Sequence, residues 1–244
     1  METSHRFVVT IDGAAGTGKT SVAQELAERL GTDCLDTGAM YRAVSVLAVE
    51  HGIDPTDGKG LAKAINELGI RFDWKQKPPT ILVGGEDVSN RVRDLDVSSV
   101  VSIVAKQPEV RTVLVEQQQR IAREHPLLVT EGRDQGSVVF PDAIVRFFLE
   151  ARIDERTKRR VKQLEESGKA VENAQVQQDI SARDQIDSTR IDGPLTCPLG
   201  VVWKQPSSNG QGQGRRNGSR DRCTAKGISG SLVVRTRRPS KRWA

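Results

Sequence analysis

The sequence lacks any apolar run of about 18 residues, the length that a membrane-spanning helix requires. Its first six residues are polar and lead directly into a strand-like segment, without the long apolar stretch of a secretory signal peptide. We therefore expect a protein that stays in the cytoplasm and does not enter a membrane.

Cysteine is also scarce. Cys34, Cys197 and Cys223 are the three cysteines of the chain, and their spacing is unlike that of zinc ligands. An odd number leaves one cysteine without a partner, so neither a zinc site nor a framework of disulfide bonds is expected.

An excess of positive charge is absent from most of the chain, although the formal net charge is +5. Residues 196–244 contain three Lys and eight Arg against one Asp, a net charge of +10, whereas the preceding 195 residues carry −5. The basic character therefore belongs to the C-terminal segment. It gives no reason to expect the folded part to bind nucleic acid.

The pattern of apolar residues predicts an α/β fold. Segments with helical spacing alternate with short β-rich segments, as in a parallel sheet with right-handed crossovers. The predicted strands of this sheet are residues 6–12, 34–35, 127–130 and 144–149. The predicted helices are residues 19–30, 39–50, 61–68, 94–106, 109–124, 153–166 and 171–188. A small inserted β unit is predicted from three further short strands, 70–74, 80–83 and 86–88.

This regular pattern ends after Leu195. Residues 205–222 consist mainly of Gly, Ser, Asn, Gln and Arg, a composition that buries too little to offset the entropy of ordering. We expect them to be disordered. Residues 232–234 form a short apolar run that is compatible with a strand.

Residues 13–20, GAAGTGKT, match the phosphate-binding loop motif G-x-x-x-x-G-K-[ST], and they connect a predicted strand to a predicted helix as that motif requires. The glycines allow backbone N–H groups to turn toward phosphate oxygens, and the helix N-terminus adds its positive dipole end. Lys19 is predicted to reach the β- and γ-phosphates, and the Thr20 hydroxyl to ligate Mg²⁺. The residues expected to bind nucleotide phosphates are Gly13, Ala14, Ala15, Gly16, Thr17, Gly18, Lys19 and Thr20.

Basic residues gather where the predicted strands end. The second strand is followed by LDTGAMYR, residues 35–42, and the third by EGRDQG, residues 131–136. Ligands of open α/β sheets bind beyond the carboxyl ends of the strands. Taken singly, each arginine is also compatible with a solvated surface position. As a set, four arginines are expected to face one pocket and to bind a phosphate dianion there: Arg42, Arg133, Arg183 and Arg190.

Several segments together resemble the bacterial cytidylate kinase family of P-loop nucleoside monophosphate kinases. They are VTIDGAAGTGKTSVA, LDTGAMYR, SIVAKQPEVR, EGRDQGSVVFPDA and RDQIDSTR, together with the β insert around residues 72–91. The resemblance covers about residues 7–195. It implies a parallel P-loop sheet flanked by helices, a small β-containing acceptor insert at about 38–111 and a helical lid at about 152–180.

The resemblance also implies a role for each matching residue. Arg42, Arg133, Arg183 and Arg190 would hold the acceptor phosphate, and Asp187 would lie near the ribose hydroxyls. The residues that would recognise cytosine are Thr37, Ser102, Arg111 and Asp134, and Tyr41 would lie in the same acceptor site. A carboxylate that accepts from the N4 amino group of cytosine disfavours uracil, which has an acceptor at that position.

The implied reaction transfers the γ-phosphoryl group of ATP to CMP or dCMP in the presence of Mg²⁺. The attacking group is an anionic phosphate oxygen, so we expect positioning and charge neutralisation instead of a general base. Lys19, Arg133, Arg183 and Arg190 are the residues expected to take part in catalysis, and we expect a monomer. The lid would contribute Arg156, Arg159 and Arg160, which could close over the phosphates.

The family pattern breaks after Leu195, where a further strand and a closing helix are expected. Residues 196–244 instead give an atypical basic segment, and the parallel sheet is expected to lack that strand, which would expose the edge of its neighbour. One hypothesis is a frameshift near codon 195, which resequencing of the coding DNA tests. The alternative is a genuine, divergent basic tail.

Three other interpretations of the function stay open. A uridylate, adenylate or shikimate kinase would share the phosphate loop and the arginines but differ in the residues that read the acceptor. The basic tail could bind nucleic acid with a strong dependence on salt. The altered C-terminus could also leave an inactive, kinase-like remnant.

Overall fold

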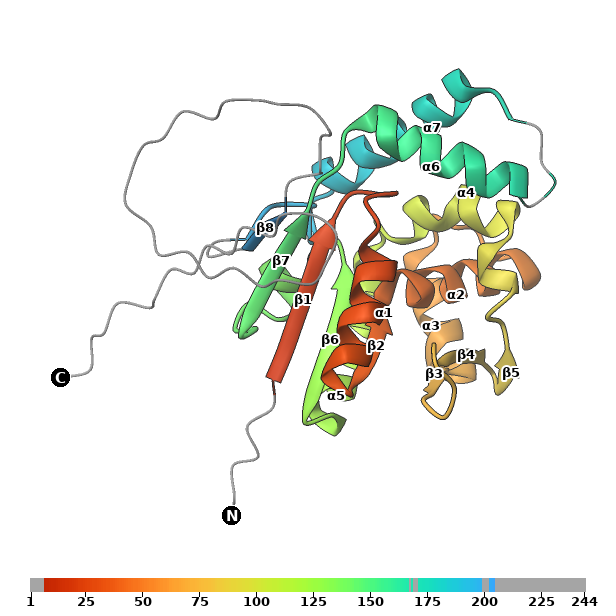
Figure 1. Ribbon diagram of the computed structural model, residues 1–244. Helices are drawn as coiled ribbons and strands as arrows, with labels where there is room; N and C mark the ends of the chain where they lie inside the picture. Colours follow the sequence, from red (N-terminus) through yellow and green to blue (C-terminus); the bar gives the residue numbers. More distant parts are fainter. Residues whose placement is uncertain (1–6, 167, 169–170, 199–201, 205–244) are drawn as a thin grey trace, which may run out of the picture.

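The computed structural model describes residues 7–166, 168, 171–198 and 202–204 of the chain. Figure 1 shows a central parallel sheet with helices on both faces, a second small sheet to one side, and two helices above the ends of the strands. The predicted α/β class is therefore confirmed. Within the described residues, no helix combines the length and the apolar character that crossing a bilayer requires.

The main sheet has five parallel strands in the order β2-β6-β1-β7-β8. Their bounds are Phe7–Gly13 for β1, Asp33–Asp36 for β2, Leu127–Gly132 for β6, Val145–Leu149 for β7 and Val202–Lys204 for β8. The register pairs Asp12 with Gly132 and Asp36 with Glu131. The carboxyl ends of β1, β2 and β6 therefore meet at one edge of the sheet.

Helix α1 (Lys19–Leu30) covers one face of this sheet, in front of it in Figure 1. Its buried residues Ala23 and Ala27 pack with Val9, Ile11 and Val129 of the strands. This is the helix predicted from residue 19 to residue 30. It ends where predicted because Gly31 adopts φ 64°, a left-handed conformation that few other residues tolerate.

The small antiparallel sheet has the order β3-β4-β5, with bounds Ile70–Asp73, Thr80–Val83 and Glu86–Asp87. It packs against helix α2 (Thr37–Glu50), beside α3 (Gly58–Leu68), a 3₁₀ turn at Arg91–Arg93 and α4 (Leu95–Val104). Helix α2 begins two residues earlier than predicted because the carboxylate of Asp36 accepts a hydrogen bond from the Ala39 N–H, 3.0 Å away.

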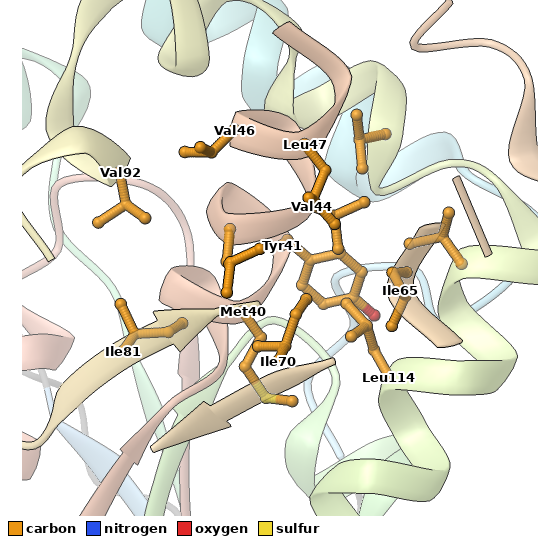
Figure 2. Close-up of a cluster of buried hydrophobic side chains, with 14 of the residues drawn as sticks. Met40, Tyr41, Val44, Val46, Leu47, Ile65, Ile70, Ile81, Val92 and Leu114 are labelled. Carbon is orange, nitrogen blue, oxygen red and sulfur yellow. The ribbon is translucent and has the colours of Figure 1, made fainter. Parts of the chain in front are cut away.

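One apolar core joins this insert to the main sheet. Figure 2 shows side chains of α2, among them Met40 and Val44, packed between Ile81 of the small sheet and Leu114 of helix α5 (Pro108–Glu124). The same core reaches Leu128 of β6. Because α2 begins directly after β2, this core positions the first residues of α2 relative to the ends of the main strands.

Helices α6 (Ile153–Glu166) and α7 (Asn173–Thr189) pack against each other and lie above the carboxyl ends of β1 and β7 in Figure 1. A five-residue π-helical turn, Gln135–Val139, follows β6 at the same edge. Both features bring residues that are distant in sequence to the place where the phosphate loop leaves β1.

The prediction that a strand is missing after Leu195 was wrong. Strand β8 pairs in parallel with β7, in a register that aligns Phe147 with Val202 and Leu149 with Lys204. These backbone hydrogen bonds complete the edge of the sheet. The predicted disorder of residues 205–222 and the short strand at 232–234 lie outside the described residues.

Candidate functional site

The phosphate loop, residues 13–20, forms a tight turn between β1 and α1. A side chain at Gly13 would place its Cβ 2.2 Å from the carbonyl oxygen of Leu149, so this position admits only glycine. The Lys19 ammonium is buried and donates to the carbonyl oxygen of Ala14 at 2.8 Å. Its positive charge is therefore held inside the loop.

Buried charges surround this lysine. Burial lowers the pKa of Lys19, and the neighbouring guanidinium of Arg133 lowers it further. Burial raises the pKa of Glu131, and the carboxylate of Asp36 adds to that effect. The positive and negative groups at the loop are thus both held away from water, so the charge of a bound phosphate would act strongly on them.

The oxygen atoms beside the loop suit a hard cation. The Thr20 hydroxyl donates to the carboxylate of Glu131, so these two oxygen ligands lie side by side. Mg²⁺ prefers such ligands and takes only one or two from protein when phosphates complete its shell. The described residues contain no cluster of three or more His, Cys, Asp or Glu side chains that could hold a metal without such help.

A cavity of about 50 Å³ lies between the ends of the strands and helix α7. Eight of the predicted acceptor-site residues line it: Thr37, Tyr41, Ser102, Arg133, Asp134, Arg183, Asp187 and Arg190. The structure therefore brings together residues from α2, α4, the loop after β6 and α7. Arg111 contacts Tyr41 of this set through a hydrogen bond. Arg42 lines a different, larger groove.

The charged groups of this cavity are paired with one another. Arg111 donates to Asp134 at 2.5 Å, and both side chains are almost fully buried. Arg133 donates from Nε to Asp187 at 2.9 Å. Arg190 lies 3.7 Å from Asp134, so the carboxylate of Asp134 has a cation on two sides.

Two hydroxyl groups of the cavity already have partners. Thr37 donates to the backbone carbonyl of Glu131 at 2.7 Å, which ties α2 to β6. The Tyr41 hydroxyl accepts a hydrogen bond from Arg111 at 3.2 Å. Both contacts orient the side chains that surround the Arg111–Asp134 pair.

A separate, larger groove of about 1,160 Å³ lies between α1, the insert and α6. Arg42 reaches it from α2 and donates to the Ser98 hydroxyl at 2.7 Å and to the carbonyl of Val92 at 3.2 Å. Arg160 of α6 lines the same groove. Burial, together with the charges of Arg133 and Arg42, lowers the pKa of Arg183 to about 10, so these cations form one crowded group.

Two of the three predicted lid arginines contact the phosphate loop, and the third lines the larger groove. Arg156 is buried and donates from Nη1 to the carbonyl oxygen of Ala15 at 3.1 Å and to Asp184 at 2.5 Å. Arg159 donates to the carbonyl oxygen of Thr17 at 3.4 Å. Arg160 faces the groove instead. Helix α6 therefore already lies against the phosphate loop through its first two turns.

Sequence reasoning did not assign three acidic residues that the structure places at this site. Asp12 accepts from the N–H groups of Gln135 at 2.8 Å and Gly136 at 2.7 Å, and Glu131 contacts Thr20. Asp184 pairs with Arg156. Asp12 and Asp184 are sequence neighbours of predicted site residues, and Glu131 follows the predicted strand at residues 127–130. This position in the sequence is the signal by which they could have been predicted.

Comparisons with known proteins agree with this geometry. The family model for cytidylate kinase matches residues 9–210, and so extends beyond Leu195. The chain is 40% identical over 194 residues to a cytidylate kinase of Caldanaerobacter subterraneus, a match that covers 80% of this chain and 84% of that one. It is 43% identical over 200 residues to one of Mycolicibacterium paratuberculosis, covering 82% and 88%. The chain belongs to the cytidylate kinase family of phosphotransferases.

Proposed function

We propose that this chain transfers the γ-phosphoryl group of ATP to CMP or dCMP, with the phosphate loop as the donor site and the cavity beside α7 as the acceptor site. The observation that carries the proposal is the junction of these two sites. Residues 13–20 and the eight residues of the cavity lie at one edge of the sheet, with Arg133 close to both. In this assignment, residues 38–111 form the acceptor insert and residues 152–180 the lid.

On the donor side, Lys19 neutralises the charge of the β- and γ-phosphates. Its ammonium donates one hydrogen bond to the carbonyl of Ala14 and has further N–H groups for phosphate oxygens, and the negative phosphates raise its pKa again. Thr20, with Glu131 beside it, would hold Mg²⁺. When bound, Mg²⁺ would supply further neutralisation of the phosphate charge.

On the acceptor side, the crowded cations Arg42, Arg133 and Arg183 bind the phosphate of the nucleoside monophosphate. Their mutual repulsion is relieved when an anion lies between them, which favours a phosphate dianion over a neutral ligand. Arg190 takes part from the far side of the cavity. These residues place the acceptor oxygen in line with the γ-phosphate, and an anionic oxygen needs no base to activate it.

The base is read by Arg111 and Asp134. A buried carboxylate accepts from the N4 amino group of cytosine, and a guanidinium donates to N3 or O2. Uracil turns an acceptor toward the carboxylate, so both oxygens repel each other. Ser102 and Thr37 line the same cavity and would also contact the base, and Asp187, which lines it too, would bind the ribose hydroxyls.

The test is release of ADP from ATP and Mg²⁺ with each nucleoside monophosphate in turn. We expect turnover with CMP and dCMP that exceeds turnover with UMP and AMP by at least tenfold in kcat/KM. Chelation of the divalent cation should abolish turnover with every acceptor. Equal rates with all four acceptors would contradict the assignment of Arg111 and Asp134.

A further inference from the structure

Asp184 lies on the helix that carries acceptor residues, but its side chain contacts the donor side. Its neighbour Arg183 and the later residues Asp187 and Arg190 line the acceptor cavity. Asp184 itself accepts a hydrogen bond from Nη1 of Arg156 at 2.5 Å. The pair is shielded from water, since the Arg156 side chain is 9% exposed and that of Asp184 is 23% exposed.

Arg156 continues this connection to the phosphate loop. The same Nη1 donates to the carbonyl oxygen of Ala15 at 3.1 Å. Its Cβ lies 3.3 Å from the point where a side chain at Gly16 would begin, so the arginine lies directly against the loop. A continuous path of two hydrogen bonds therefore runs from α7, through Arg156 of α6, to the loop.

Three buried polar atoms at this contact have no partner among the residues that the structure describes. They are Oδ1 of Asp184, Nε of Arg156 and Nε of Arg183. Buried polar atoms are almost always paired in folded proteins, so an unpaired set calls for a reason. A pair with a purely structural role would satisfy these atoms. Here the Nε donors of Arg156, which contacts the loop, and of Arg183, which lines the acceptor cavity, are both unused among the described residues.

We propose that Asp184 is a positioning residue for ATP: it holds Arg156 against the phosphate loop and thereby ties the position of the acceptor helix to the donor site. This inference rests on the proposed function, because it takes residues 13–20 as the ATP site. Asp184 acts through Arg156, which lies between it and the loop.

The proposal predicts which of the two Michaelis constants changes. Loss of the Asp184 carboxylate should weaken binding at the donor site, although the residue lies on the acceptor helix. For Asp184→Asn we expect the KM for ATP to rise about tenfold, as for loss of one charged hydrogen bond, with the KM for CMP within about twofold of the original. The matched control is Asp179→Asn, which removes the same charge from α7 at an exposed position where Asp179 accepts a hydrogen bond from Gln175. It should leave both constants unchanged.

A double-mutant cycle shows whether Asp184 acts through Arg156. The variant Arg156→Gln should raise the KM for ATP, and adding Asp184→Asn to it should raise that constant no further. Asp184→Glu, which restores the carboxylate, should recover part of the loss. Thermal unfolding of each variant accompanies the kinetics, and if Asp184→Asn does not fold, Arg156→Gln and Asp184→Glu supply the comparison.

Three outcomes would overturn the inference: a rise in the KM for CMP alone, effects of the two substitutions that multiply in the double variant, or an unchanged KM for ATP in Asp184→Asn. Turnover by the unsubstituted protein distinguishes failure of the proposed function from these three outcomes. If the unsubstituted protein shows no turnover with any acceptor, the reaction assignment has failed. If the unsubstituted protein turns over CMP and the KM for ATP is the same in Asp184→Asn, only the role of Asp184 has failed.

Discussion

Asp12 and Gly136 are joined by a hydrogen bond of 2.7 Å, in which the backbone N–H of Gly136 donates to the Asp12 carboxylate. The N–H of Gln135 donates to the other oxygen of the same group at 2.8 Å. Asp12 directly precedes the phosphate loop, and Gln135 directly follows Arg133 and Asp134. One buried carboxylate therefore fixes the phosphate loop relative to the loop that follows β6.

This carboxylate predicts a specific dependence of stability on pH. Burial raises the pKa of Asp12 from 3.8 to about 6, against the opposing effect of its two backbone hydrogen bonds. The folded state thus binds this proton more tightly than the unfolded state. Its contribution to stability is complete below about pH 4 and is lost as the pH rises through 6.

The measurement is urea unfolding of the original chain and of Asp12→Asn at several pH values between 4 and 7. The amide cannot ionise, so the free energy of unfolding of the original chain should fall relative to the variant as the pH rises from 4 to 6. A constant offset of about 1–3 kcal/mol is expected besides, because the amide leaves one backbone N–H without an acceptor. A difference that does not change with pH would show that Asp12 ionises as it does in water.

A second prediction concerns Gly193, in the turn that follows α7. Its φ is +59°, and a Cβ there would lie 2.1 Å from both Nη2 of Arg111 and Oδ2 of Asp134. The turn is held by a hydrogen bond of 2.5 Å from Arg190 to the Gly193 carbonyl. Gly193→Ala should therefore displace the base-reading pair and raise the KM for CMP at least tenfold, with a loss of stability of about 2 kcal/mol.

Gly168→Ala is the matched control for this substitution. Gly168 has a φ of +79°, but nothing lies within 4 Å of the place where its Cβ would be. Gly168→Ala therefore introduces the same backbone strain of a positive φ, but its Cβ does not clash with any neighbouring atom. If both variants showed the same KM for CMP, the close approach of Gly193 to Arg111 would have no part in recognition.

A third prediction concerns the choice of base. In Asp134→Asn, the side-chain amide can turn either its oxygen or its NH₂ group toward the nucleotide, so it accepts cytosine and uracil alike. The ratio of kcat/KM for CMP to that for UMP should fall at least tenfold. Asp192→Asn provides the control, since Asp192 is exposed and its charge acts on Arg111. An unchanged ratio in Asp134→Asn would assign base selection to other residues.

Much of the donor site could be predicted from the sequence because its motif is local. The loop, the helix after it and the position of Lys19 follow from eight consecutive residues and the elements that flank them. Most of the acceptor site also followed, because strand ends and helical spacing placed Arg133, Arg183 and Asp187 on one side of the fold.

What the sequence did not predict depends on contacts between distant segments. The pairing of Asp184 with Arg156 and the capping of Gln135 and Gly136 by Asp12 join elements whose relative positions are set only by packing. Strand β8 was missed for a different reason. Its pairing with β7 uses backbone groups, which every residue carries, so a change of side chains after Leu195 did not reveal whether the strand was present.

The crowding of Arg42, Arg133, Arg160 and Arg183 has a consequence for the lifetime of the protein. The like charges lower the pKa of Arg42 and of Arg183 while no anion is bound, and an anion that binds between the arginines offsets this repulsion. A ligand that binds only the folded state adds about 2.7 kcal/mol when its concentration is 100 times its Kd. The persistence of the folded chain should therefore rise and fall with the supply of nucleotides, so that a starved cell loses the enzyme as well as its substrate.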